Sequence, residues 1–136
     1  YKIKPGIKWS DGQPLTAADS IFSYETAADP ITPVNKKHID LTDSYTAADD
    51  LSIEWVSQPG LAANDLWNYF WTPLPAHAWK AMSPDELLMS DEVNRHPLGR
   101  GAFMVNEWVP GDHSQVRSMT SANWRMDAVI SFRIPC

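Results

Sequence analysis

The sequence is short of several residue types, and each shortage excludes a class of protein. Its single cysteine, Cys136, cannot form an internal disulfide, which rules out a disulfide framework and leaves the role of Cys136 open. Only 11 lysines and arginines stand against 17 aspartates and glutamates, without a basic run, so the chain repels nucleic-acid phosphates. The longest apolar stretches, such as residues 62–70, are interrupted and fall short of the roughly 18 residues of a membrane span. We therefore expect neither nucleic-acid binding nor a membrane-spanning segment.

The sequence also lacks the usual marks of an enzyme or a metal protein. It has no glycine-rich phosphate loop, no paired cysteines and no G-x-S-x-G motif. No two of its histidines are spaced as i and i+4: they are His38, His77, His96 and His113. Adjacent carboxylates, at 49–50, 85–86 and 91–92, diverge on a strand or a helix and make poor acid–base pairs. We expect no catalytic residue, metal or cofactor, and a carboxylate-based hydrolase is the weaker alternative.

What is present suits one globular domain. The 136 residues are 43% hydrophobic and 21% charged, which is enough apolar material for a sizeable core. Seven tryptophans either fill that core or form an aromatic recognition surface, and the sequence leaves both interpretations open. The chain starts without methionine, on an alternating stretch, and we expect it to be an internal piece of a longer protein.

The clearest helix signal lies at residues 16–28. Thr16 and Asp19 resemble a capping box with Asp in place of Glu, and Pro30 should end the helix near Ala28. A second helix start is predicted at residues 83–86, where Ser caps, Pro takes the first position and Glu the third. Helical spacing also predicts an element at residues 66–71, and a short helical turn follows at 77–81.

Alternating apolar residues predict the strands. Extended segments are expected at residues 1–9, 51–55, 102–108, 114–118 and 128–134. The third and fourth of these should form a hairpin with a loop of about four to five residues. Strands and helices together predict an α/β or α+β fold, a mixed sheet with flanking helices.

The turn before the first helix is predicted to be structural rather than functional. Trp9 ends an alternating run and is expected to be buried. Asp11 can bond its own backbone, and Gly12 takes a positive φ at little cost. Thr16 then caps the helix, so these residues anchor and cap the fold.

Six segments, in order, share the pattern of one protein family: residues 7–19 (IKWSDGQPLTAAD), 49–54 (DDLSIE), 74–77 (LPAH), 97–103 (PLGRGAF), 107–112 (EWVPGD) and 127–135. They resemble the family-five extracellular solute-binding proteins, which deliver peptides and similar solutes to ABC importers. The resemblance implies structural roles for Gly99, Gly101 and Trp108. The sequence departs from the pattern at Ser20, where an apolar residue is usual, and at Ala102, where proline is usual.

The resemblance implies a fold and a role. The fold is part of a two-lobe, class II periplasmic-binding-protein-like architecture, and residues 1–136 are a single fragment of its first lobe, with the second lobe absent. The implied function is substrate binding for an ABC transporter, in the periplasm or at the cell surface, as a monomer. The partners are a peptide or small solute and the permease subunits. Contact with the membrane occurs only through the permease or a lipid anchor outside this stretch.

The resemblance also indicates where solute contacts the chain. The irregular run at residues 32–39 follows the signature helix and approaches the cleft in peptide binders. Asn35 and His38 are therefore the candidate ligand-binding residues, against the alternative of an ordinary surface loop. The solute is left open among peptides, sugars, opines and metal chelates. A solute sensor read by a receptor is the alternative role, and half a cleft alone should bind its solute weakly.

Overall fold

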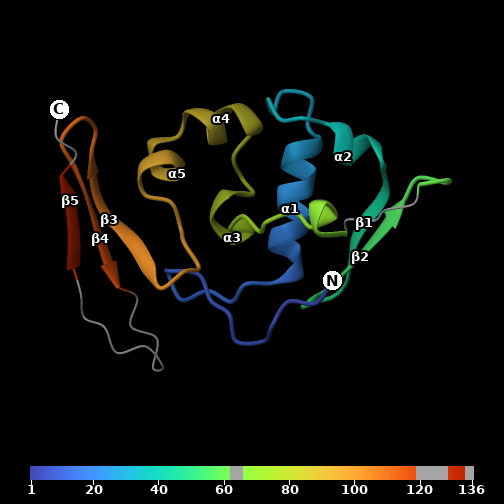
Figure 1. Ribbon diagram of the computed structural model, residues 1–136, viewed down its shortest axis with the longest axis horizontal. Coiled ribbons are helices and arrows are strands. Elements are labelled where there is room, and N and C mark those ends of the chain that lie inside the picture. Colours follow the sequence, from blue (N-terminus) through green and yellow to red (C-terminus); the bar gives the residue numbers. More distant parts are fainter. Residues whose placement is uncertain (62–65, 119–128, 134–136) are drawn as a thin grey trace. The chain divides into compact units, whose positions relative to one another are not determined.

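The computed structural model describes residues 1–61 and 66–118, and the backbone of residues 129–133 (Figure 1). The chain divides into two compact units. Unit 1 comprises Tyr1–Gly6 and Leu15–Glu86, and unit 2 comprises Ile7–Pro14 and Leu87–Cys136. In the described part of the chain, no helix has the length and apolar character needed to cross a membrane.

Helix α1, Ala17–Ala28, has the predicted bounds. Thr16 and Asp19 form the capping box, in which the Thr16 amide donates to Asp19 Oδ2 at 2.9 Å. The helix carries no basic residue in its last turn. Instead, Lys36 Nζ donates to the carbonyls of Ala27 and, at 2.6 Å, of Asp29. A cation from outside the helix therefore satisfies carbonyls at its negative end.

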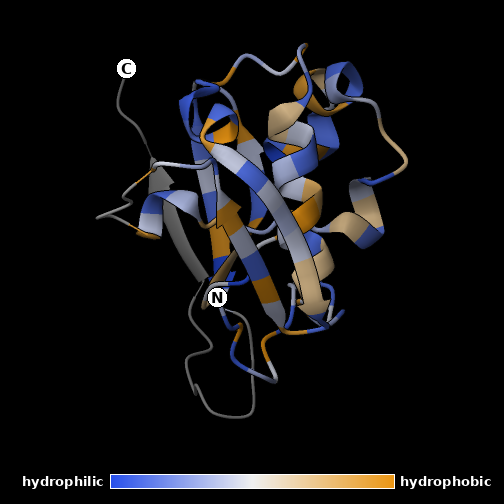
Figure 2. Cartoon of the chain, turned by 90° about the vertical axis from the view of Figure 1, so that its right-hand side faces the viewer, coloured by the Kyte–Doolittle hydropathy of each residue, from blue (hydrophilic) through white to orange (hydrophobic). Residues whose placement is uncertain are grey.

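Strands β1, Thr42–Asp49, and β2, Ser52–Ser57, form an antiparallel pair in unit 1. Only the second strand was predicted. Figure 2, which faces this pair, shows hydrophobic bands on β2 and a mostly pale β1. The β1 sequence has one large apolar residue, Tyr45, so no alternation marks it as a strand.

The chain start lies beside β2. The Ile53 amide donates to the Tyr1 carbonyl at 2.9 Å, and the Ile3 amide donates to the Leu51 carbonyl at 2.7 Å. The predicted extended run over residues 1–9 therefore exists as isolated bridges, Lys2 with Ser52 and Lys8 with Pro14, rather than as a continuous strand. Pro5 and Gly6, with φ of 83° at Gly6, interrupt it.

The core of unit 1 joins α1 to the two strands. Ala17, Tyr45 and Ile53 are buried together. Partly buried apolar residues pack around them: Tyr1, Ile3, Ile21, Tyr24, Trp55, Phe70 and Trp71. Most of these are aromatic, and with Tyr45 they bring rings from five separate segments of the chain to this core.

Short helices fill the rest of the chain: α2 at Lys37–Asp40, the 3-10 helix η1 at Leu66–Tyr69, α3 at Ala76–Trp79, α4 at Pro84–Met89 and α5 at Asp91–Arg95. The predicted element at residues 66–71 thus shrinks to one 3-10 turn. The predicted start of α4 is confirmed, because the Ser83 amide donates to Glu86 Oε2 at 2.7 Å and the Glu86 amide donates to Ser83 Oγ at 3.3 Å.

Unit 2 contains a second antiparallel sheet, ordered β3-β4-β5, from Phe103–Val109, His113–Ser118 and Val129–Arg133. The predicted hairpin is present, but its loop has three residues, 110–112, and not four to five. Gly111 has φ of 82°, and the Asp112 amide donates to the Val109 carbonyl at 3.1 Å, which closes a tight turn. The fold is α/β as predicted, with antiparallel ladders in the described residues rather than one mixed sheet.

Candidate solute-contact surface

The candidate residue His38 lies in helix α2, not in an irregular loop as predicted. Its half-buried imidazole meets the Tyr69 ring edge-on, with centroids 5.1 Å apart and an interplanar angle of 78°. Its backbone is also held, because Thr42 Oγ1 donates to the His38 carbonyl at 2.7 Å. Trp55 Nε1 donates in turn to Thr42 Oγ1 at 3.0 Å. The structure therefore fixes His38 within an ordered, partly aromatic setting.

The second candidate, Asn35, has a local structural task. Its Oδ1 accepts a hydrogen bond from the Lys37 amide at 2.9 Å, and this bond turns the chain into α2. The side chain is exposed. The carbonyl half of the amide is thus committed to the fold, and Asn35 and His38 play different parts although they are near in sequence.

Sequence reasoning missed the aromatic group around His38. Trp55 and Tyr69 stack with centroids 4.3 Å apart and an interplanar angle of 29°. With His38 they form what we call the ring cluster: His38, Trp55 and Tyr69. Tyr69 is buried at its centre, while His38 and Trp55 are half-buried and keep part of their surface in solvent. The only sequence signal for it was the number of tryptophans.

The tryptophans divide between the core and the surface. Trp9 and Trp79 are buried, at 3% and 4% exposure, whereas Trp67 is 82% and Trp108 46% exposed. Trp67 lies on η1, two residues before Tyr69 of the ring cluster. η1 is held at its start by Tyr1, whose hydroxyl donates to the Leu66 carbonyl at 2.5 Å. An exposed indole on a fixed turn is a typical recognition element.

The signature turn is built as predicted. The Trp9 amide donates to the Gln13 carbonyl at 2.8 Å, and the Gly12 amide donates to the Trp9 carbonyl at 3.0 Å. Asp11 Oδ1 accepts from the Gln13 amide at 3.0 Å. Gly12 has φ of 90°, a conformation that a side chain would disfavour. These contacts show that residues 9–13 form the turn itself.

The two glycines of the matched segment 97–103 differ from one another. Within unit 2, Gly99 exchanges hydrogen bonds with Ser10: the Ser10 amide donates to the Gly99 carbonyl at 2.8 Å, and the Gly99 amide donates to Ser10 Oγ at 3.2 Å. Gly101 is exposed, and a Cβ there would meet nothing within 4 Å. Nothing in the structure explains a need for glycine at position 101.

Unit 2 has its own hollow, a cavity of about 310 Å³ on one face of the β3–β4 pair. Its lining comes from α5, the segment after it and the two strands: Asn94, Arg95, Pro97, Val105, Trp108, Ser114 and Val116. Trp108, expected to be structural, therefore contributes an exposed indole to this surface.

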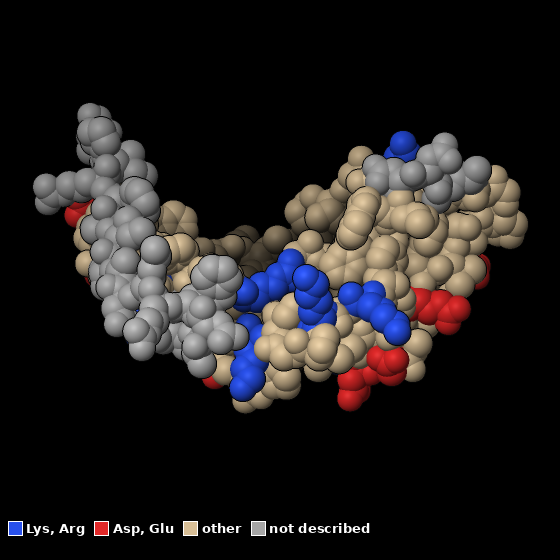
Figure 3. All heavy atoms as spheres, turned by 60° about the horizontal axis from the view of Figure 1, so that its bottom comes forward, with Lys and Arg blue, Asp and Glu red and all other residues tan. Residues whose placement is uncertain are grey.

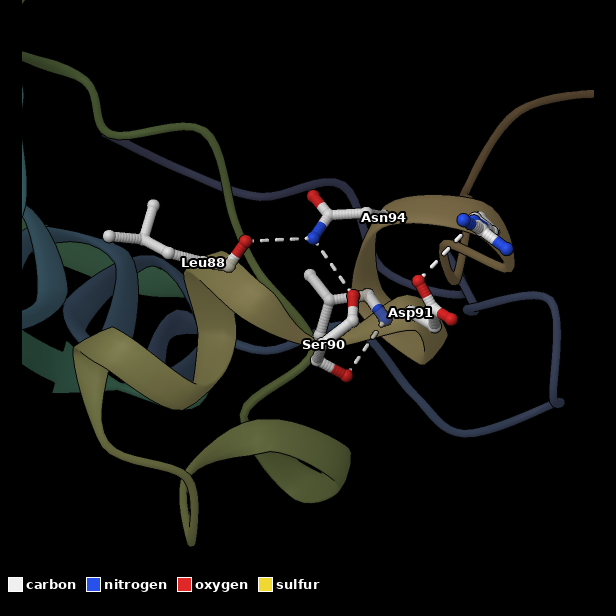
Figure 4. A network of polar contacts seen from close by, with 6 residues as sticks. Leu88, Ser90, Asp91 and Asn94 are labelled. Atoms are coloured by element: carbon white, nitrogen blue, oxygen red, sulfur yellow. Dashed lines mark hydrogen bonds and ion pairs between the residues drawn. The ribbon is translucent and has the colours of Figure 1, made fainter. Parts of the chain in front are cut away.

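The polar residues on the α5 side of this cavity are engaged within unit 2 (Figure 4). Asn94 Nδ2 donates to the carbonyls of Leu88 at 3.0 Å and Ser90 at 2.8 Å. Arg95 Nε lies 3.3 Å from Asp91 Oδ1. The cavity consequently offers mainly apolar contact.

In the part of the chain that the structure describes, the charged groups give no sign of a metal centre. Within residues 1–61 and 66–118, no group of three or more His, Cys, Asp or Glu side chains is placed to hold a metal ion. The pKa of the half-buried His113 is raised by its hydrogen bond to Asp112 and by the nearby Glu107. Figure 3 shows basic as well as acidic side chains on the face it draws.

Comparison with known proteins decides the family. Residues 1–124 match the bacterial extracellular solute-binding proteins, family 5, in their middle part. The chain belongs to this family. The oligopeptide-binding protein OppA of Lactococcus lactis subsp. cremoris is 26% identical over 133 residues, which cover 81% of this chain and 22% of that protein.

Solved structures agree. A putative peptide-binding protein, AppA, from Clostridium difficile is 25% identical with a TM-score of 0.77, covering 98% of this chain and 29% of that one. The ABC transporter substrate-binding protein CtaP from Listeria monocytogenes is 24% identical with a TM-score of 0.79, covering 98% and 28%. The chain therefore spans less than a third of each of these relatives. The likeness confirms the class II periplasmic-binding-protein fold class, and the relatives are named for binding rather than for hydrolysis.

Proposed function

We propose that this chain is part of the substrate-binding component of an ABC importer, which captures peptides or related small solutes outside the cytoplasmic membrane. The observation that carries the proposal is the family match over residues 1–124. OppA of Lactococcus lactis is named for oligopeptide binding, and we extend that substrate class to this chain. The protein acts in the periplasm or at the cell surface and performs no chemistry on its solute.

We further propose that residues 1–136 belong to the first of two lobes, which closes with a second lobe over the solute. Affinity then depends on the balance between open and closed forms. The partners are the solute and the permease subunits, and the protein works as a monomer. Its contact with the membrane is through the permease or a lipid anchor outside these residues.

Within this lobe, the ring cluster is the proposed place of solute contact. His38 and Trp55 are each partly exposed to solvent, and the ring of each packs against the buried Tyr69 ring. Rings fixed in this way offer stacking and apolar contact at a low cost in conformational entropy. The imidazole adds a polar group that can bond a peptide backbone.

A titration followed by two-dimensional NMR tests this function. Trileucine is added to the 136-residue chain, and the amide shifts of residues 35–38 and 69 are expected to move with a dissociation constant in the millimolar range, because one lobe leaves half of the solute in water. His38→Ala should weaken the response, and His77→Ala, at an exposed position in α3, should leave it intact. Shifts confined to the cavity residues of unit 2, or no shifts at all, would overturn the assignment.

A further inference from the structure

Helix α1 carries a buried polar stripe whose burial the capping box alone does not explain. Asp19, Ser20 and Ser23 are exposed by only 3%, 0% and 6%. Their spacing of one and four residues places them on one side of the helix. Buried polar groups destabilise a fold unless they are hydrogen-bonded, so this stripe must have partners.

The partner is the segment that leaves η1. Ser20 Oγ donates to the Trp71 carbonyl at 2.5 Å, and Ser23 Oγ donates to the Thr72 carbonyl at 2.7 Å. Both bonds join residues about fifty positions apart in the chain, so they are tertiary contacts and not local ones. The two hydroxyls thus hold the start of this segment against α1.

Asp19 holds the rest of the segment. Its backbone carbonyl accepts from the Leu74 amide at 3.2 Å, and its Oδ1 accepts from the Ala76 amide at 2.9 Å. The intervening residues, Pro73 and Pro75, have no amide hydrogen to satisfy. Along residues 73–76, each residue that has an amide hydrogen therefore donates it to Asp19.

Ser20 also completes a closed set of hydrogen bonds with Tyr45. The Trp71 amide donates to Tyr45 Oη at 3.2 Å, and Tyr45 Oη lies 2.8 Å from Ser20 Oγ. Because the Ser20 proton goes to the Trp71 carbonyl, the Tyr45 hydroxyl must donate to Ser20. Both backbone groups of Trp71 are then satisfied by two buried side chains. Burial raises the pKa of Tyr45, which keeps its hydroxyl protonated for this role.

This arrangement gives a reason for serine at a position where the resembled family usually carries an apolar residue. An apolar side chain at position 20 would leave the Tyr45 hydroxyl without its acceptor and the Trp71 carbonyl without its donor. Unsatisfied buried groups of this kind cost about 1–3 kcal/mol each. The hydroxyls of Ser20 and Tyr45 therefore form one unit, and each requires the other.

Trp71 lies two residues after Tyr69, the central ring of the ring cluster. We infer that Ser20 is a positioning residue: through Tyr45 and the Trp71 backbone it sets the Tyr69 ring between Trp55 and His38. This inference rests on the proposed function for its consequence, because the ring cluster is the assigned solute-contact surface. Ser20 itself makes no contact with solute.

The test compares three variants of the 136-residue chain. Ser20→Ala and Tyr45→Phe each remove one hydroxyl of the closed set. Thr26→Ala is the matched control, since Thr26 Oγ1 donates to the Phe22 carbonyl of its own helix, at 2.8 Å. The first readout is amide hydrogen exchange at Trp71, expected to quicken about tenfold in both test variants. The second is the ring-proton shifts of Tyr69 and the indole shift of Trp55, and the third is trileucine affinity.

The outcomes separate the inference from the function on which it rests. Altered Tyr69 and Trp55 shifts in Ser20→Ala and Tyr45→Phe, but not in Thr26→Ala, support positioning, and the double variant should add little to either single change. If these shifts move while the unaltered chain binds no trileucine, Ser20 still positions Tyr69 and the proposed function fails. Unchanged ring shifts in Ser20→Ala, or the same changes in Thr26→Ala, would overturn the inference.

Discussion

Helices α1 and α4 begin with the same device and differ in what surrounds it. Both start with a capping box, Thr16 with Asp19 in α1 and Ser83 with Glu86 in α4. Asp19 is 3% exposed and also accepts from the Ala76 amide, whereas Glu86 is exposed and its carboxylate serves its own helix start. A cap that is predictable from sequence can thus be a local start signal alone or also a tertiary anchor, and burial decides which.

The largest expected effect comes from breaking the buried cap. Asp19→Ala removes the capping carboxylate and leaves the Ala76 amide without its acceptor, so the free energy of unfolding should fall by about 2–4 kcal/mol. Chemical denaturation of this variant and of Glu86→Ala measures the difference. Equal losses in the two variants would show that the two caps are alike and that the contact with Ala76 adds nothing.

A smaller effect is expected from the other half of the same box. Thr16→Ala should cost about 1 kcal/mol, because it removes the cap side chain but leaves the tertiary bonds of Asp19 in place. The midpoint of denaturation reports this loss. A loss as large as that of Asp19→Ala would mean that Thr16, and not the carboxylate, connects α1 to residues 71–76.

The smallest effect concerns pH. The Ser83 amide, followed by its hydroxyl, holds the pKa of Glu86 below its ordinary value of 4.5. A carboxylate with a lowered pKa stabilises the fold above its unfolded-state pKa and loses that contribution as the pH falls through its folded-state pKa. Between about pH 5 and about pH 3, the melting temperature of the unaltered chain should therefore fall slightly more steeply than that of Glu86→Gln. Parallel curves would contradict the lowered pKa.

The same contrast explains how much of the fold the sequence could predict. The bounds of α1, the start of α4, the β3–β4 hairpin and the turn at Trp9 all follow from local chemistry: caps, prolines and glycine turns. Strand β1 was not predicted, because a strand with one large apolar residue shows no alternation of apolar and polar residues. Its place depends on Tyr45, which is buried against α1 and β2.

The candidate site was predictable only in part. Sequence and resemblance pointed to Asn35 and His38. No sequence pattern could predict that the Tyr69 ring contacts His38, 31 residues earlier, and stacks on Trp55, 14 residues earlier. Such ring contacts arise from tertiary packing, which local sequence does not encode. The role of Ser20 was likewise invisible, and only the departure from the family pattern marked the position. Cys136, whose role the sequence left open, lies outside the described residues.

The central claim is that residues 1–136 supply one side of a two-lobed solute site. Calorimetry with one oligopeptide, on this chain and on a longer form that includes the downstream residues, tests it most directly. Loss of half of the contacts, about 4 kcal/mol, predicts that the longer form binds roughly a thousandfold more tightly. Equal affinities would contradict the account and would show that the whole site lies within these 136 residues.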